Sequence, residues 1–366
     1  MDTDENRVNI INRASRKRSV PDANHHVFKQ TSSAKKRVVL GDLTNCGSVG
    51  SIQSSDSRKH LKQAKIERVD EECVESDASI SFESVHNDRL LYAPLIYQHL
   101  HSLEIEEKRR PLPDYMERIQ KDITVGMREI LVDWLVEVAE EYKLVSDTLF
   151  LAVSYIDRFL SSHNLKRNKL QLLGVSSMLV ASKFEEVSPP HVEDYCYITD
   201  NTYTKEEVVQ MEKDLLKFLE MEPSNPTPKT FLRYKCELCS DATQEDVMPS
   251  CSALEFLSWF LVELSLLDYS CLRFLPSMVA ASAVFIAKFT IQPEKHPWGL
   301  SMQRYSGYKP CELKDCVLAI HDLQLSRRLS SSRAIREKFS HQKFKCVAAL
   351  LSPSEIPVSY FEDFDE

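Results

Sequence analysis

The residues with the clearest potential for metal chemistry are Cys236 and Cys239, which form a Cys-x-x-Cys pair. Two such pairs at a suitable distance along a chain can hold a zinc ion with four thiolates. The ten cysteines of this chain contain no second pair of that spacing and follow no regular pattern. We therefore expect reduced thiols of an intracellular protein, without a disulfide framework and without a metal site.

The sequence also lacks the motifs that usually mark catalytic centres. It contains no glycine-rich phosphate loop, no nucleophile elbow and no His-Glu-x-x-His segment. These motifs are the common signatures of nucleotide-binding and hydrolytic sites. We therefore expect neither a cofactor nor a catalytic centre in this chain.

Charge divides the chain into a basic N-terminal part and an acidic remainder. Up to Arg68 there are fourteen Lys and Arg against seven Asp and Glu, a net charge of +7. The total formal charge is −9, so the remainder carries −16. An acidic body argues against a nucleic-acid surface. Residues 1–85 are rich in Ser, Asn, Lys and Arg without a sustained apolar period, and we expect a disordered tail there. The longest uncharged stretches, 170–182 and 274–287, are too short to span a membrane.

Helices are the favoured elements of the remainder, because only seven glycines occur and three of them lie near the N-terminus. Apolar residues recur at helical spacing, and capping residues or prolines bound the runs. Helices are expected from Arg89, after Thr124, from Asp147, over 169–186, in the short segment 191–198 and from Lys205 to Leu219. The segment Asn-Pro-Thr-Pro at 225–228 then breaks the chain, and we place a domain boundary there.

The second half of the sequence repeats the first at a spacing of 105 residues. This spacing aligns residues 181–184 (Ala-Ser-Lys-Phe) with 286–289 (Ile-Ala-Lys-Phe), and Tyr203 with Tyr308. It also pairs Leu149, Ile156 and Phe159 with Leu254, Leu261 and Leu264. Helical apolar patterns can align by chance, but one spacing that holds across three helices favours a tandem duplication. We therefore expect an all-α protein with two tandem five-helix repeats.

The helix after Thr124 has more apolar residues than one packing face requires. At about 100° per residue, they fall into two sectors. One stripe consists of Met127, Ile130, Leu131, Trp134 and Val138, and the other sector of Val132, Leu135, Val136 and Ala139. A narrow face of Glu129, Asp133, Glu137 and Glu140 remains for water. Periodicity favours a helix that is buried on two sides, and the alternative is a stripe left open for a partner.

The segment MREILVDWLVEV at 127–138 is similar to the signature of the cyclin box. YIDRFLSS, KLQLLG, ASKFEE and YITDNTYTKEEVVQMEKDLL follow in the order seen in A-type cyclins, and HPWGLSMQRYSGY and IHDLQLSRR extend the resemblance to roughly residues 88–362. The chain looks most like the third subgroup of plant A-type cyclins. The resemblance implies an N-terminal cyclin box with its preceding helix over 86–225 and a C-terminal box with an extension over 226–366. It also implies a non-catalytic subunit that forms a heterodimer with a cyclin-dependent kinase, activates it and recruits substrates during the cell cycle.

The resemblance assigns roles to particular residues. In cyclins the open stripe is a docking groove for Arg-x-Leu peptides of substrates and inhibitors. Its counterparts here are Met127, Ile130, Leu131 and Trp134 for the leucine, Glu137 for the arginine, and Arg167, Leu170 and Gln171 at the rim.

A second set of residues corresponds to the kinase contact and to the fold of the box. Without the resemblance, Lys183 and Glu212 would be expected to be solvated charges. With it, they bind the kinase, and Phe184 and Ile96 add apolar contact, whereas Met221 and Pro223 replace apolar residues that usually touch the kinase. Arg128 and Asp157 resemble a structural ion pair between the first two box helices.

Motifs in the tail suggest how such a protein is regulated. Arg37, Leu40 and Asn45 fit the destruction box, Arg-x-x-Leu with a following Asn, which mitotic ubiquitin ligases recognise. The basic clusters 16–18 and 35–37 suit nuclear import, although basic runs are also common in solvated tails. We expect ubiquitin-dependent degradation and a nuclear location, with room for a cytoplasmic pool.

Two alternatives remain beside a kinase subunit. One is a cyclin-fold transcription factor that grips DNA with its helical repeats, against which the acidic body and the missing N-terminal zinc ribbon count. The other is a cyclin-like scaffold without a kinase. We expect no nucleic-acid partner and no membrane partner.

Overall fold

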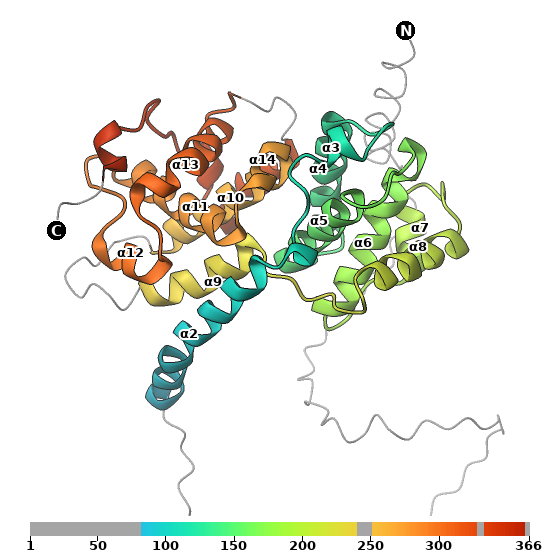
Figure 1. Ribbon diagram of the computed structural model, residues 1–366, viewed down its shortest axis with the longest axis horizontal. Helices are drawn as coiled ribbons and strands as arrows, with labels where there is room; N and C mark the ends of the chain where they lie inside the picture. Colours follow the sequence, from blue (N-terminus) through green and yellow to red (C-terminus); the bar gives the residue numbers. More distant parts are fainter. Residues whose placement is uncertain (1–81, 240–250, 328–332, 363–366) are drawn as a thin grey trace, which may run out of the picture. The chain divides into compact units, whose positions relative to one another are not determined.

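The computed structural model describes residues 82–239, 251–327 and 333–362. Within these ranges all regular structure is helical, which confirms the all-α prediction (Figure 1). Across the same ranges, each helix is too short or too polar to cross a membrane.

The first half of the described chain contains a long leading helix and then the first repeat. The leading elements are α2 (Phe82–Glu104), η2 (Glu107–Arg109) and α3 (Tyr115–Arg118). The first repeat consists of α4 (Val125–Glu141), α5 (Ser146–Leu160), η3 (Arg167–Lys169), α6 (Leu170–Glu185), α7 (Val192–Ile198) and α8 (Lys205–Phe218). Thr124 caps α4 as predicted, since its side chain accepts a hydrogen bond from the Met127 backbone N–H at 3.3 Å. The apolar helix α6 packs against α4, α5, α7 and α8 and is the centre of the repeat.

The second half has the same plan and adds a C-terminal extension. Its repeat consists of α9 (Pro228–Cys239), α10 (Cys251–Leu267), η4 (Tyr269–Arg273), α11 (Pro276–Ile291), α12 (Leu300–Ser306) and α13 (Pro310–Gln324). The extension contains α14 (Arg333–Phe339), η5 (Gln342–Phe344), η6 (Val347–Ala349) and η7 (Val358–Phe361). Helix α11 packs against α9, α10 and α13, as α6 does against its own neighbours. A shift of 105 residues lays α4–α8 onto α9–α13 in order, so the tandem five-helix repeats are confirmed.

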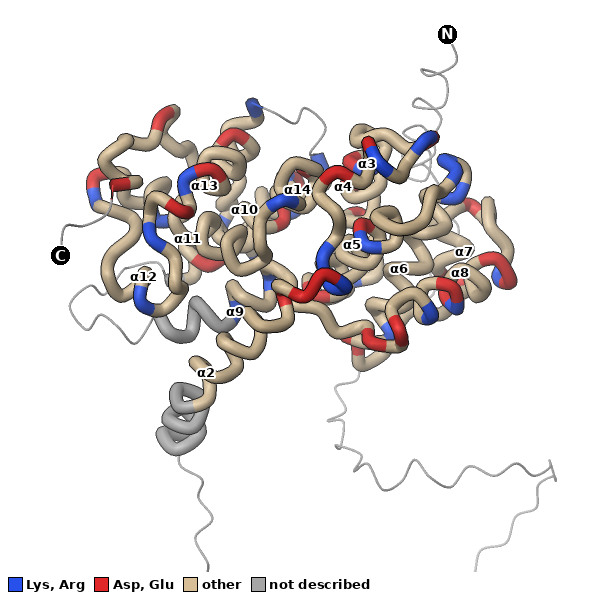
Figure 2. The backbone as a smooth tube through the Cα atoms, in the orientation of Figure 1, with Lys and Arg blue, Asp and Glu red and all other residues tan. Residues whose placement is uncertain are grey.

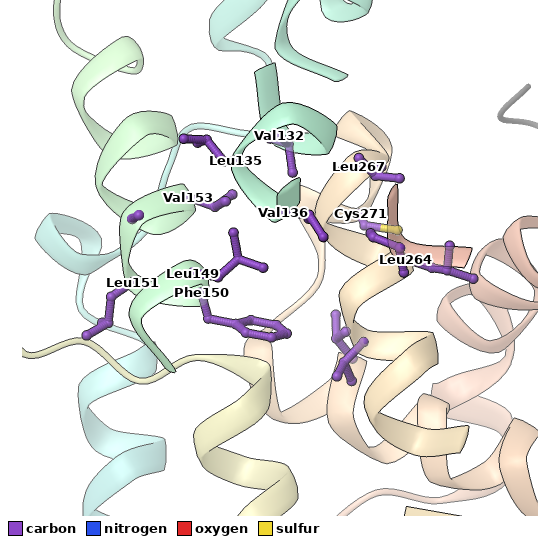
Figure 3. Packing of buried hydrophobic residues seen from close by; sticks show 14 of the residues in the cluster. Val132, Leu135, Val136, Leu149, Phe150, Leu151, Val153, Leu264, Leu267 and Cys271 are labelled. Carbon is purple, nitrogen blue, oxygen red and sulfur yellow. The ribbon is translucent and has the colours of Figure 1, made fainter. Parts of the chain in front are cut away.

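The two repeats share one hydrophobic core. Buried side chains of both belong to a single cluster. Figure 3 shows side chains of α4 and α5, such as Val136 and Leu149, beside side chains of α10 such as Leu264. Burying apolar surface between the repeats stabilises them as one body.

A buried ion pair reinforces this junction. The guanidinium of Arg128 on α4 binds Asp157 on α5 through two hydrogen bonds, Nε to Oδ1 at 2.6 Å and Nη2 to Oδ2 at 2.7 Å. Its Nη1 donates to the carbonyl of Leu266 on α10 at 2.9 Å, and the Tyr115 hydroxyl donates to Asp157 Oδ1 at 2.9 Å. Burial, together with the Asp157 charge, raises the pKa of the Tyr115 phenol. The structure thus brings the two residues together in a buried position, with each charge fully engaged.

Helix α2 is attached to the second repeat, although it precedes the first in sequence. The buried carboxylate of Glu104 accepts hydrogen bonds from the backbone N–H of Ser277 at 2.9 Å and from its hydroxyl at 2.6 Å. Ser277 lies in the first turn of α11, so Glu104 caps that helix from a distance. The Tyr97 ring packs against the rings of Phe231 and Tyr305.

The C-terminal extension folds back over the second repeat. The Phe361 ring stacks on Phe285 of α11 with centroids 5.5 Å apart, and Tyr360 packs against Phe289 at 6.2 Å. Phe289 is only 1% exposed. The extension therefore covers the end of the central helix of this repeat.

Candidate functional site

The apolar stripe of α4 lies along α6 and is neither fully buried nor fully open. Leu131 and, at the start of α6, Leu170 are each 6% exposed. Met127, Ile130 and Trp134 are half-buried. Two buried leucines thus form an apolar floor, and three more apolar side chains of the stripe remain partly accessible.

A glycine of α6 makes room for this floor. A Cβ atom placed on Gly174 would lie 2.8 Å from Cδ1 of Leu131, which is closer than carbon atoms approach without strain. Glycine in a helix interior costs about 1 kcal/mol relative to alanine. The close approach of α4 and α6 accounts for a glycine at this position in spite of that cost.

The residues predicted at the rim differ in burial: Arg167 is exposed, whereas Leu170 is buried and belongs to the floor. Glu137 is exposed and Gln171 is half-buried. The Arg167 side chain donates from Nε to Asp122 Oδ1 at 2.6 Å, and its backbone N–H donates to Oδ2 at 2.8 Å. These bonds lower the pKa of Asp122 and hold Arg167 in place at the start of α6. Asp122 is a rim residue that the sequence did not indicate.

The acidic face of α4 differs from the expectation of a face exposed to water. Asp133 Oδ1 accepts a hydrogen bond from the backbone N–H of Ala334 in α14 at 3.2 Å, and burial raises the pKa of Asp133 to about 7. Glu140 pairs with Lys343 at 2.9 Å and with Lys338 at 3.5 Å. The expectation was wrong for these two residues, because the C-terminal extension returns to cover that side of the helix. Polar periodicity alone shows which face is polar but not what packs on it.

The predicted kinase contacts Lys183 and Glu212 bind each other. Lys183 Nζ donates to Glu212 Oε1 at 2.6 Å, between the end of α6 and the middle of α8. The lysine side chain is 46% exposed and the glutamate 11%. Phe184, the next residue along α6, is 48% exposed. An ion pair therefore lies beside a large apolar side chain that faces solvent.

Other exposed apolar residues lie on α2 and after α8. On α2, Ile96 is 37% exposed, and Tyr92 and Leu95 are 55% and 60% exposed. Met221, in the loop after α8, is 70% exposed. Among these residues the sequence analysis assigned only Ile96 as a contact. Met221 was noted as a departure from the family, and its exposure shows that an apolar surface persists there.

Several predicted features lie outside the described residues. These are the destruction box of Arg37, Leu40 and Asn45, the two basic clusters, and the side chains of Cys236 and Cys239. In the ranges that the structure covers, no three His, Cys, Asp or Glu side chains are placed to hold a metal ion.

Comparisons with known proteins place this architecture. Residues 95–223 match the family described as cyclin, N-terminal domain, and residues 226–353 match cyclin, C-terminal domain. Cyclin-A3-2 of Oryza sativa subsp. japonica is 61% identical over 275 residues, which cover 75% of this chain and 70% of the relative. Putative cyclin-A3-1 of Arabidopsis thaliana is 48% identical over 365 residues, 99% of each chain. The X-ray structure of a viral cyclin from herpesvirus saimiri has the same fold, with a TM-score of 0.51 at 22% identity, over 69% of this chain and 99% of its own.

Proposed function

The chain belongs to the cyclin family, in the A3 subgroup of plant A-type cyclins, and from this premise we propose that it activates a cyclin-dependent kinase. A cyclin is a non-catalytic regulatory subunit of a protein kinase. The proposed kinase surface consists of Lys183, Glu212, Phe184 and Ile96. The observation that carries the proposal is the exposed Phe184 beside the Lys183–Glu212 pair, because a partner would remove an unfavourable apolar surface from water.

Activation follows from a rigid repeat that meets a mobile element. The packed first repeat would hold the regulatory helix of the kinase in the position that closes the kinase's own Lys-Glu ion pair. On binding, Lys183 and Glu212 would exchange their mutual bond for bonds to the kinase. The exchange keeps the charge of the buried Glu212 paired, since a group of the kinase takes the place of Lys183. ATP, magnesium and the acceptor hydroxyl bind to the kinase.

Co-purification with a cyclin-dependent kinase, followed by a phosphorylation assay, tests this function. The double variant Lys183→Ala, Glu212→Ala should lose co-purification and activation while its circular dichroism remains helical. Lys288→Ala, at the equivalent position of the second repeat, is the matched control and should behave like the parent. Unchanged kinase binding by the folded double variant would refute the assignment.

The stripe of α4 is the proposed docking groove for Arg-x-Leu peptides. The half-buried Met127, Ile130 and Trp134 above the buried Leu131 and Leu170 can accept a leucine side chain. The exposed carboxylate of the nearby Glu137 can pair with an arginine. This groove would bring substrates and inhibitors to the bound kinase.

The tail is the proposed route to timed degradation by a mitotic ubiquitin ligase. The support is the sequence Arg37-x-x-Leu40 with the following Asn45. Replacement of Arg37 and Leu40 by alanine should lengthen the half-life of the protein after mitotic exit in dividing cells. Equal decay of parent and variant would show that this motif does not direct degradation. The basic clusters support a nuclear location, which imaging of a tagged chain without them would test.

A further inference from the structure

A cleft of about 510 Å³ lies where the segment after α2 meets the carboxyl ends of α5 and α8. Figure 2 shows acidic and basic residues side by side in that segment. Four cationic side chains line the cleft, those of Lys108, Arg109, Arg110 and Arg158. It is separate from the proposed docking stripe and from the Lys183–Glu212 pair, since neither contributes to its lining.

Arg158 lies at the floor of this cleft and is incompletely bonded. Only 6% of the Arg158 surface is exposed to solvent. Its Nε donates to the backbone carbonyl of Lys108 at 3.2 Å, but its buried Nη1 has no hydrogen-bond partner. Burial is the main cause that lowers the pKa of the guanidinium, and the charge of Arg109 adds to it, whereas Tyr155 and the Glu222 carboxylate act in the opposite direction. A buried cationic N–H without an acceptor is unfavourable, and an oxyanion is the ligand that a guanidinium fork fits best.

The carboxylates around the cleft pair with two of the other cations, Lys108 and Arg109. Glu222 Oε2 accepts from Lys108 Nζ and from Arg109 Nη2, each at 3.2 Å. Glu106 also pairs with Arg109 at 2.8 Å, and Glu220 lies 3.7 Å from Lys108 Nζ. Glu107 also lines the cleft. Among the ion pairs of the described chain, none joins these carboxylates to Arg158.

The two arginines lie deeper in the cleft than the carboxylates. The side chain of Arg109 is 13% exposed, whereas those of Glu222 and Glu220 are 53% and 72% exposed. Arg158 and Arg109 therefore form a cationic floor, and Lys108, whose side chain is 51% exposed, lies with the acidic groups at a solvated rim where charges are screened. The carbonyl ends of α5 and α8 also border the cleft and disfavour an anion. That effect falls off within the last turn of each helix, whereas the charge-assisted bonds of a guanidinium act directly on the phosphate oxygens.

We propose that this cleft binds the phosphate group of a phosphorylated serine or threonine in a partner protein. A phosphate monoester carries about 1.5 to 2 negative charges and three acceptor oxygens, so it can bridge Arg158, Arg109 and Lys108 at once. It enters by displacing the Glu222 carboxylate, which is 53% exposed, from Lys108 and Arg109. The Lys108 pair is solvated on both sides and is easily broken. Phosphate binding in this cleft does not require a bound kinase. A test of the cleft therefore gives a result that is independent of the function proposed above.

Fluorescence anisotropy on the full chain, purified without a kinase, tests the site. The probes are labelled peptides with a central phosphoserine or phosphothreonine in randomised flanks, and their unphosphorylated equivalents. The phosphorylated pools should bind and the others should not. Arg158→Met should weaken binding about tenfold or more, since it removes the fork from the floor. The charge control Arg327→Met, which removes an exposed arginine of the second repeat, should leave binding unchanged.

A variant of opposite sign keeps the test decisive if Arg158→Met fails to fold. Glu222→Gln removes the carboxylate that competes for Lys108 and Arg109, and should tighten phosphopeptide binding about three- to tenfold. Glu193→Gln, in an exposed pair with Lys205, is its matched control. Loss of affinity or no change in Glu222→Gln would show that the cleft is only structural and would overturn the proposal. Inorganic phosphate serves as a competitor. If inorganic phosphate binds but phosphorylated peptides bind no better than unphosphorylated ones, the assignment to a partner protein is overturned.

Discussion

The two repeats have the same five helices but differ at the end of the central helix. Phe184 at the end of α6 is 48% exposed, whereas its counterpart Phe289 at the end of α11 is 1% exposed. Phe289 packs against the rings of His321 and Tyr360, the latter from the C-terminal extension. A duplicated surface has thus been covered by the chain itself in one repeat and left open in the other.

The charges at this surface follow the same division. Lys183 has Glu212 as its partner, whereas the residue equivalent to Glu212 in the second repeat is Val317, which is fully buried. Helix geometry alone therefore does not distinguish the two surfaces. The covering segment and a few side chains distinguish them, and substitutions at paired positions can separate these contributions.

The largest difference in stability should come from the equivalent arginines Arg128 and Arg233. Arg128→Met leaves the Asp157 carboxylate buried without its partner and should lower the free energy of unfolding by about 3–5 kcal/mol. Arg233, whose side chain is 52% exposed and pairs with Asp147, should cost less than about 1 kcal/mol when replaced by methionine. Urea denaturation of the two variants measures both values. Equal losses would mean that the two junctions are energetically alike.

Substitutions of the two phenylalanines should affect different quantities. Loss of the Phe289 ring should lower stability, and loss of the Phe184 ring should weaken kinase binding. Phe289→Ala removes a fully packed ring and should cost about 3 kcal/mol or more in unfolding free energy. Phe184→Ala should change stability by less than about 1 kcal/mol, because its ring is half exposed, but weaken kinase binding about tenfold or more. Denaturation and a kinase titration report the two quantities. A Phe184 variant that binds the kinase normally would contradict the assignment of this exposed ring to the kinase contact.

The docking stripe should be confined to the first repeat, because the residues equivalent to Leu131 and Trp134 are Cys236 and Cys239. Trp134→Ala should weaken docking of an Arg-x-Leu peptide by about 1.5–3 kcal/mol, and so raise KM for a long substrate that carries the motif. Phosphorylation of a short peptide without the motif should be unchanged. Glu137→Ala should give a milder loss of about 0.2–1 kcal/mol at the solvated rim.

Cys239→Ala, the equivalent substitution in the second repeat, is the control. Two outcomes would contradict the assignment of the stripe to substrate docking. An unfolded Trp134 variant would assign the stripe to the core. Equal impairment on both substrates would assign it to the kinase contact.

A smaller, pH-dependent effect on stability should arise where the extension covers α4. Since burial raises the pKa of Asp133 to about 7, the folded chain binds a proton there more tightly than the unfolded chain does. Its contribution to stability is therefore present below about pH 4 and is lost as the pH rises to about 7. Asp133→Asn removes this dependence and should be more stable than the parent by about 1–2 kcal/mol at pH 8, but not at pH 4. Parallel stability curves of parent and variant between these pH values would contradict this account.

Local signals made the first repeat largely predictable. The Thr124 cap, the prolines after α6 and the apolar spacing of α5 and α6 each act within a few residues, and the structure has helices where they indicate. The spacing of 105 residues then extended the plan to the second repeat. Contacts between distant segments left no such signal. Neither the cap of α11 by Glu104 nor the cover of Asp133 by α14 could be predicted, since a polar residue on a helix face looks the same whether water or another helix meets it.

The glycine beneath the docking stripe suggests how recognition can be tuned from inside the fold. A methyl group at position 174 would push the side chain of Leu131 outward, because the two would otherwise be only 2.8 Å apart. The helix would gain in intrinsic propensity while the pocket above it became shallower. A shallower pocket would alter the peptide docking proposed for this stripe without any change in a residue that lines it. A smaller side chain at position 131 would restore the space.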